Sequence, residues 1–162
     1  MTKTSIALTL SLLVAGCSSV GQSQILSTTN TVAKSNSEAK IVNVEATGEA
    51  NNYTFAVTVS SPDTGCNRYA DWWEVVTPEG ELIYRRVLLH SHVDEQPFER
   101  TGGQVNITPE QPVIVRVHMS PDGYSNSAQQ GTVASGFSEV TLPENFASDL
   151  ATVEPLPENC AF

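Results

Sequence analysis

The sequence has little positive charge. Eight Lys and Arg residues stand against 18 Asp and Glu residues, which gives a formal net charge of −10. Nucleic-acid phosphates and anionic lipid headgroups are bound by clusters of Lys and Arg. This balance therefore argues against a nucleic-acid partner and against polybasic docking on a membrane. It suits a soluble domain that is held near a surface by other means.

Motifs of catalysis are also missing from the sequence. There is no GxSxG nucleophile motif and no cysteine–histidine pair with a free thiol. The pair Gly102-Gly103 lacks the Lys and the following helix of a phosphate-binding loop. We therefore expect a protein that is not an enzyme and that carries no cofactor.

The first 17 residues carry a targeting signal. Lys3 precedes a mostly apolar run of about ten residues, 5–14, which is too short to span a bilayer as a helix. The run leads into Val14-Ala15-Gly16-Cys17, which resembles the lipobox of bacterial lipoproteins. The resemblance implies a signal peptide over residues 1–16 and a lipidated Cys17. A plain secretory signal, cut at an Ala-x-Ala-like site, is the alternative.

The residue after the lipobox bears on location. In enterobacteria-like systems an aspartate in this position favours retention in the inner membrane, and this chain has Ser18. The resemblance therefore implies an outer-membrane lipoprotein on the periplasmic face, with the inner membrane or the cell surface as alternatives. Two or more acyl chains give stable anchoring where one chain is marginal.

Cysteine is scarce. Of the three cysteines, lipidation of Cys17 leaves Cys66 and Cys160, an even pair in an oxidising compartment. We expect a disulfide between them that ties down the C-terminal tail. No CxxC spacing or flanking histidine favours a metal site at either one.

Beyond the signal, the pattern predicts an all-β chain. Residues 17–39 are rich in Ser, Thr, Asn and Gln and read as the lipidated Cys followed by a flexible tether. Residues 40–142 contain about seven or eight short strands with turn residues between them, which predicts an immunoglobulin- or fibronectin-like β-sandwich. The strands expected with the clearest alternation are 53–60 and 113–119. Residues 143–162 predict an acidic C-terminal strap over the sandwich.

The densest chemistry lies in an expected hairpin over residues 71–95. With a turn at Pro78-Glu79-Gly80, Trp72 should face Arg86 and Trp73 should face Arg85, with Glu74 within reach of both arginines. Adjacent strand residues point to opposite faces, so one tryptophan should be covered by a loop or exposed. Ordinary cross-strand packing is one interpretation, and an exposed binding surface is the other. The candidate binding residues are Tyr69, Trp72, Trp73, Tyr84, Arg85 and Arg86.

Two histidines follow the second strand of this hairpin. His90 and His92 should share one face, which suits metal chelation by the pair together with Asp94 and His118. The spacing is similar to the HxHxDH motif of metallo-β-lactamases, which would imply a metal-dependent hydrolase. Here Glu95 replaces the last histidine, and the chain is too short for the α/β layers of that fold. The interpretation we favour is that these histidines hydrogen-bond neighbouring groups on a polar sheet face.

Together these features predict a lipid-anchored envelope lipoprotein whose sandwich is a non-catalytic binding or interaction module. The expected partners are the membrane, through the N-terminal lipid, and an unidentified protein or glycan. One alternative is a carbohydrate- or peptidoglycan-binding module that uses exposed aromatic residues. The other is a periplasmic protein that binds metal through His90 and His92.

Overall fold

A computed structural model of the chain describes residues 38–161, which belong to one compact unit. The predicted signal peptide, Cys17 and most of the predicted tether lie outside the described residues. The described part holds nine β-strands and one short 3-10 helix. In residues 38–161 no helix has the length and apolar character needed to cross a membrane.

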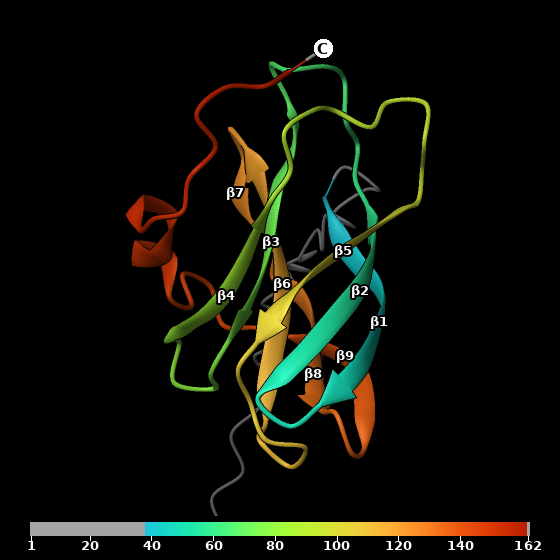
Figure 1. Cartoon of the computed structure of the whole chain (residues 1–162). Helices are drawn as coiled ribbons and strands as arrows, with labels where there is room; N and C mark the ends of the chain where they lie inside the picture. Colours follow the sequence, from blue (N-terminus) through green and yellow to red (C-terminus); the bar gives the residue numbers. More distant parts are fainter. Residues whose placement is uncertain (1–37, 162) are drawn as a thin grey trace, which may run out of the picture. The chain divides into compact units, whose positions relative to one another are not determined.

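The strands form two antiparallel sheets (Figure 1). The smaller sheet has the order β1-β2-β5, with β1 at Lys40–Glu49, β2 at Asn52–Ser60 and β5 at Phe98–Val105. The larger sheet has the order β4-β3-β6-β8-β9. Its strands are β4 at Leu82–Val87, β3 at Tyr69–Val76, β6 at Val113–Ser120, β8 at Ser127–Thr132 and β9 at Gly136–Thr141, with β7 at Gly123–Tyr124 paired to β6.

The two sheets enclose one main core. Phe55 and Val57 of β2 are fully buried in the same cluster as Trp73 of β3 and Val115 of β6. Alternating apolar residues on each strand point into this layer, as period-2 side-chain placement requires. The predicted all-β sandwich is confirmed, and its immunoglobulin- or fibronectin-like character stays a prediction.

The large sheet is also covered on its outer face. Every residue of β3 is buried, although alternate side chains must point away from the main core. The outward side is closed by the C-terminal segment, residues 142–161, which carries the 3-10 helix Ser148–Thr152. Leu150 of this helix packs in a second apolar cluster with Val76 and Ile114 of the sheet. The C-terminal segment therefore gives the sheet a second, smaller core.

The hairpin register differs from the prediction by one residue. Trp72 faces Val87, Trp73 faces Arg86 and Glu74 faces Arg85, so the predicted Trp72–Arg86 and Trp73–Arg85 pairs are wrong. The cause is a bulge: the register shifts between Val75 and Val76, and β4 carries one extra residue there. This shift brings Glu74 and Arg85 into a direct cross-strand pair on the outer face.

Candidate functional site

The outer face of the large sheet is built around one buried carboxylate, Glu74. Its Oε2 accepts hydrogen bonds from Arg85 Nε at 2.8 Å and from Arg85 Nη2 at 2.6 Å. Its Oε1 accepts a bond from Arg116 Nε at 2.8 Å. All three side chains are almost completely buried. One negative charge thus holds two positive charges away from water, and the remaining guanidinium N–H groups must find other acceptors.

Backbone carbonyls of the C-terminal segment supply those acceptors. The carbonyls are those of Leu150, Val153 and Pro155 for Arg85, and those of Phe146 and Ala147 for Arg116. Each guanidinium therefore bridges the sheet to the segment that covers it. Because a buried, unpaired N–H is costly, these bonds hold the segment on the sheet.

Several aromatic side chains surround this charge cluster. The Arg85 guanidinium lies 4.5 Å from the centre of the Trp72 ring, and His118 stacks on the same tryptophan with ring centres 3.8 Å apart. His118 Nδ1 lies 2.7 Å from Asp71 Oδ1. The Arg116 guanidinium lies 3.6 Å from the centre of the Tyr124 ring. The result is a layered set of planar groups, each fixed by a charged neighbour.

Within residues 38–161, the predicted aromatic binding residues do not form an exposed surface, and Tyr84 is half-buried. Trp72 is 3 % exposed, Trp73 is fully buried and Tyr69 is buried as well. Trp73 points into the main core, where its ring centre lies 5.7 Å from that of Tyr84. Trp72, on the opposite face, is covered by Arg85, His118 and Tyr124. Of the predicted arginines, Arg85 is in the buried cluster, while Arg86 donates to Thr101 O at 3.0 Å and so links β4 to β5.

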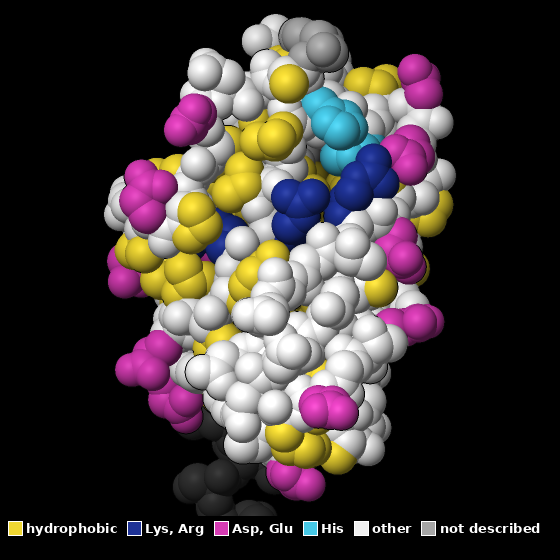
Figure 2. Space-filling model, in the orientation of Figure 1, with side chains coloured by type: hydrophobic (Ala, Val, Ile, Leu, Met, Phe, Trp, Pro, Cys, Tyr) yellow, Lys and Arg dark blue, Asp and Glu magenta, His cyan; other side chains and the backbone are white. Residues whose placement is uncertain are grey.

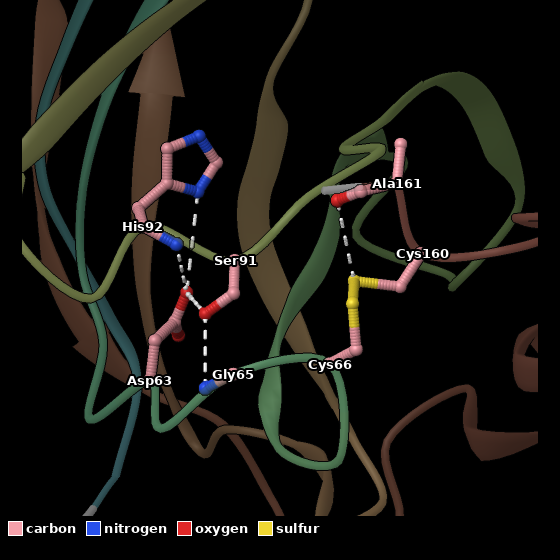
Figure 3. Close-up of a disulfide and its surroundings, with 7 residues drawn as sticks. All are labelled: Asp63, Gly65, Cys66, Ser91, His92, Cys160 and Ala161. Atoms are coloured by element: carbon pink, nitrogen blue, oxygen red, sulfur yellow. Dashed lines mark hydrogen bonds and ion pairs between the residues drawn. A yellow bond between two sulfur atoms is a disulfide. The ribbon is translucent and has the colours of Figure 1, made fainter.

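The predicted disulfide between Cys66 and Cys160 is confirmed (Figure 3). It joins the tip of loop 61–68 to the end of the C-terminal segment. Beside it, Asp63 accepts hydrogen bonds from the backbone N–H of Ala70 at 3.0 Å and of His92 at 2.8 Å. The disulfide and the Asp63 carboxylate therefore fix loops 61–68 and 88–97 at one end of the sandwich, which we call the disulfide end.

His92 belongs to the packing of this end. It is 3 % exposed, and its ring stacks on Phe98 with the centres 3.7 Å apart. Neither ring nitrogen has a hydrogen-bond partner in the described part of the chain. Burial, and secondarily the charge of Arg100, lowers the pKa of His92 from 6.5 to about 4. The imidazole is therefore neutral at neutral pH, and its 3.9 Å approach to Asp63 is no ion pair there.

This lowered pKa predicts a loss of stability in acid. The unfolded chain takes up a proton on His92 near pH 6.5, whereas the folded protein does so only near pH 4. The contribution of neutral His92 to the free energy of unfolding is thus complete above pH 6.5. It is lost as the pH falls toward 4, which lowers the free energy of unfolding by about 3 kcal/mol. Between pH 7 and pH 4, the free energy of unfolding measured in urea should fall by about 3 kcal/mol less for the His92→Phe variant than for the native protein. The exposed His90→Gln variant is the control, and equal pH slopes for the native and His92→Phe proteins would contradict the assignment.

The structure does not assemble the predicted metal site. His90 and His92 are neighbours, with ring centres 4.5 Å apart, but the His92 nitrogens are buried. His118 lies on β6 against Trp72 and Asp71, and Asp94 is exposed on the loop. Between residues 38 and 161, no three His, Cys, Asp or Glu side chains are grouped so that they could hold a metal ion.

The sequence predicts Glu74 beside the arginines of the hairpin, but it does not single out Arg116. Arg116 stands in the middle of an apolar strand, Val-Ile-Val-Arg-Val-His-Met, where a charged side chain has to be paired if it is buried. Glu74 interrupts the apolar strand β3 in the same way. Two residues of opposite charge, each inside an apolar strand, indicate a buried ion pair between the strands. Nothing in the sequence pointed to Tyr124 beside Arg116, to Asp71 as the partner of His118, or to Asp63 as the carboxylate of the disulfide end.

Comparison with known proteins gives one informative relative. A protein of Halomicrobium mukohataei named "Putative lipoprotein" is 38 % identical over 104 residues, which cover 61 % of this chain and 49 % of the relative. The chain thus spans about half the length of the curated relative that it matches. No family model and no solved structure matches the chain.

Proposed function

We propose that this chain is a membrane-anchored envelope lipoprotein, held by lipid on Cys17, whose sandwich is a non-catalytic module that binds another protein. The lipobox-like residues and the name of the Halomicrobium mukohataei relative both support the lipoprotein character. The outer membrane is the location that Ser18 favours. The observation that carries the binding role is the apolar surface of the disulfide end.

That surface is formed by loop 88–97 and the end of the C-terminal segment. Leu89 is 54 % exposed and Val93 is 50 % exposed. Ala161 lies between two hollows of about 380 and 410 Å³, of which Leu89 lines one and Val93 the other. Figure 2 shows apolar and histidine side chains gathered at this end, in the upper part of the view. Apolar groups left in water around hollows are characteristic of a surface that a partner covers.

The charge around this surface indicates the chemistry of the partner. Glu158 lines the hollow beside Leu89, and Asp94 lines the hollow beside Val93, and both carboxylates are exposed. The chain as a whole carries a net charge of −10. A partner with an apolar centre and a rim of Lys and Arg would match this arrangement, and the opposite charges would also steer the encounter.

The disulfide end is also the end at which the chain enters the domain. Lys40 of β1 pairs with Ser60 of β2, and the next residue, Ser61, donates its N–H to Gln96 of loop 88–97 at 2.9 Å. The proposed lipid on Cys17 therefore connects to the domain on the side that bears the apolar surface. We infer that the partner is itself held at the membrane.

Site-specific photo-crosslinking in native membranes tests this function. A benzoyl-phenylalanine in place of Leu89 or Val93 should crosslink to one defined protein, and the same group in place of Val42 should not. Val42 is the matched control because it is 46 % exposed but lies on β1. Charge reversal by Asp94→Lys with Glu158→Lys should lower the yield at position 89 at least fivefold.

Three outcomes would overturn the proposal. Crosslinks to a second copy of the chain would make the surface a homodimer interface, and adducts with lipid would make it a membrane contact. Crosslinking by random collision is the third outcome. It would give equal yields at positions 42, 89 and 93, or a yield at position 89 that the charge reversal does not change.

A further inference from the structure

A separate cavity of about 390 Å³ lies beside the covered face of the large sheet. One wall is the turn around β7, from Asp122 to Asn126, and the other is the start of the C-terminal segment, from Leu142 to Ala151. The cavity lies within the size range of small-molecule sites, which is roughly 300–1,000 Å³. It shares no lining residue with the apolar hollows of the disulfide end.

His118 presents a prepared hydrogen-bond acceptor to this cavity. Its Nδ1 lies 2.7 Å from the carboxylate of Asp71, which can only accept, so Nδ1 is the donor of this contact. The other ring nitrogen, Nε2, has no partner in the described part of the chain and is the ring atom left for a ligand. Trp72 stacks on one face of the His118 ring. The Tyr124 ring lies edge-on to it, with the ring centres 4.8 Å apart, and helps to hold it in place.

The positive charge at the cavity is already neutralised. Arg116 lines the wall but donates to Glu74 and to the carbonyls of Phe146 and Ala147. Arg68, near Asp122, is in an ion pair with it at 2.8 Å. An anionic ligand would therefore find no free cation here and would lie near Glu144, an exposed carboxylate.

The remaining lining mixes donors and acceptors. The side-chain amides of Asn126 and Asn145 and the hydroxyl of Ser148 can donate, whereas His118 Nε2 and Glu144 accept. The amide oxygens of the two asparagines and the hydroxyl oxygen of Ser148 can also accept, so each of these side chains is able both to donate and to accept. A sugar hydroxyl both donates and accepts, and the half-buried ring of Phe146 offers an apolar wall for a sugar's C–H face.

We propose that this cavity is a binding site for a neutral polyhydroxylated ligand, a sugar unit, with His118 Nε2 as the central acceptor and Asn145 as a donor. This site is independent of the protein-binding surface proposed above. It also differs from the aromatic surface predicted from the sequence, because Trp72 stacks on His118 and does not line the cavity.

The test is a calorimetric and NMR titration of the full chain, purified in a detergent without a sugar headgroup. The probes are D-glucose, D-galactose, D-mannose and N-acetyl-D-glucosamine, with putrescine and D-gluconate as cationic and anionic controls. At least one sugar should bind saturably and shift the His118 ring nitrogen resonance, while the two charged probes should not.

Three variants sharpen the result. Asn145→Gly should weaken sugar binding at least fivefold without disturbing the fold, because Asn145 has φ 64° and glycine adopts that conformation freely. His118→Phe keeps a flat ring on Trp72 and should weaken binding at least tenfold. Glu81→Gln alters an exposed carboxylate that does not line the cavity, and as the control it should leave sugar binding unchanged.

The proposal is overturned if none of the four sugars binds saturably up to 100 mM, if putrescine binds more tightly than every sugar, or if Asn145→Gly and His118→Phe leave binding unchanged. Failure of this site would not affect crosslinking from position 89, and a missing partner at position 89 would not affect sugar binding.

Discussion

The Glu74→Gln variant is expected to lose about 3–5 kcal/mol of its free energy of unfolding, because it leaves two buried guanidiniums without a counter-charge. Arg85 and Arg116 are each almost fully buried, and each is held by one oxygen of Glu74. A glutamine amide has nearly the same shape but offers one acceptor oxygen and no charge. Equilibrium unfolding in urea, followed by tryptophan fluorescence, measures the loss.

A matched exposed carboxylate serves as the control. Glu95 pairs with Arg100 at 2.8 Å on the surface, so Glu95→Gln should leave the urea midpoint unchanged within error. Tryptophan fluorescence is well suited because Arg85 lies over the Trp72 ring. If Glu74→Gln costs no more than Glu95→Gln, the charge cluster does not hold the outer face together.

Removal of the disulfide, by Cys66→Ser together with Cys160→Ser, is expected to cost about 4 kcal/mol, since the bond restricts the unfolded chain over a long loop. The two cysteines are separated by 94 residues in the sequence. The effect should also be local. The amide of Ala161, which donates to Leu89 O, should exchange faster with solvent, while the part of the segment bonded to Arg85 and Arg116 should stay protected.

Reductant provides the internal comparison for this prediction. The native chain in dithiothreitol should unfold at the same urea concentration as the double variant, and the double variant should not respond to reductant. Equal stability of the oxidised and reduced native chain would show that the disulfide contributes nothing. Exchange that is faster along the whole segment would show that the arginines alone cannot hold it.

Strand alternation was enough to predict the fold class. Residues 53–60 and 113–119 alternate apolar and polar or are apolar throughout, and they became β2 and β6. The signal for β5 is weaker, because Phe98–Val105 contains two adjacent glycines, Gly102 and Gly103, yet this segment pairs with β2. The sequence of β8, Ser-Ala-Gln-Gln-Gly-Thr, is polar and does not indicate a strand, yet Gln129 is buried and donates to Ile41 O at 3.3 Å.

The candidate site was harder to predict because it depends on tertiary covering. Strand alternation implies that Trp72 and Trp73 point to opposite faces, but only tertiary contacts with Arg85, His118 and Tyr124 bury Trp72. The hairpin register depends on a single bulge, and no residue of the turn indicates that bulge. The pairing of Glu74 with Arg116 joins strands that are 42 residues apart, beyond the reach of local patterns.

The most direct test of the account is the crosslink yield from position 89 in cells that produce either the native chain or the Cys17→Ser variant. The proposed function requires a lipid anchor that holds the disulfide end against a membrane-held partner. The native chain should be found in the membrane fraction with a strong crosslink to one protein. Cys17→Ser should move to the soluble fraction and lose at least nine-tenths of that crosslink. A variant that stays in the membrane, or that leaves it and keeps the full crosslink, would contradict the account.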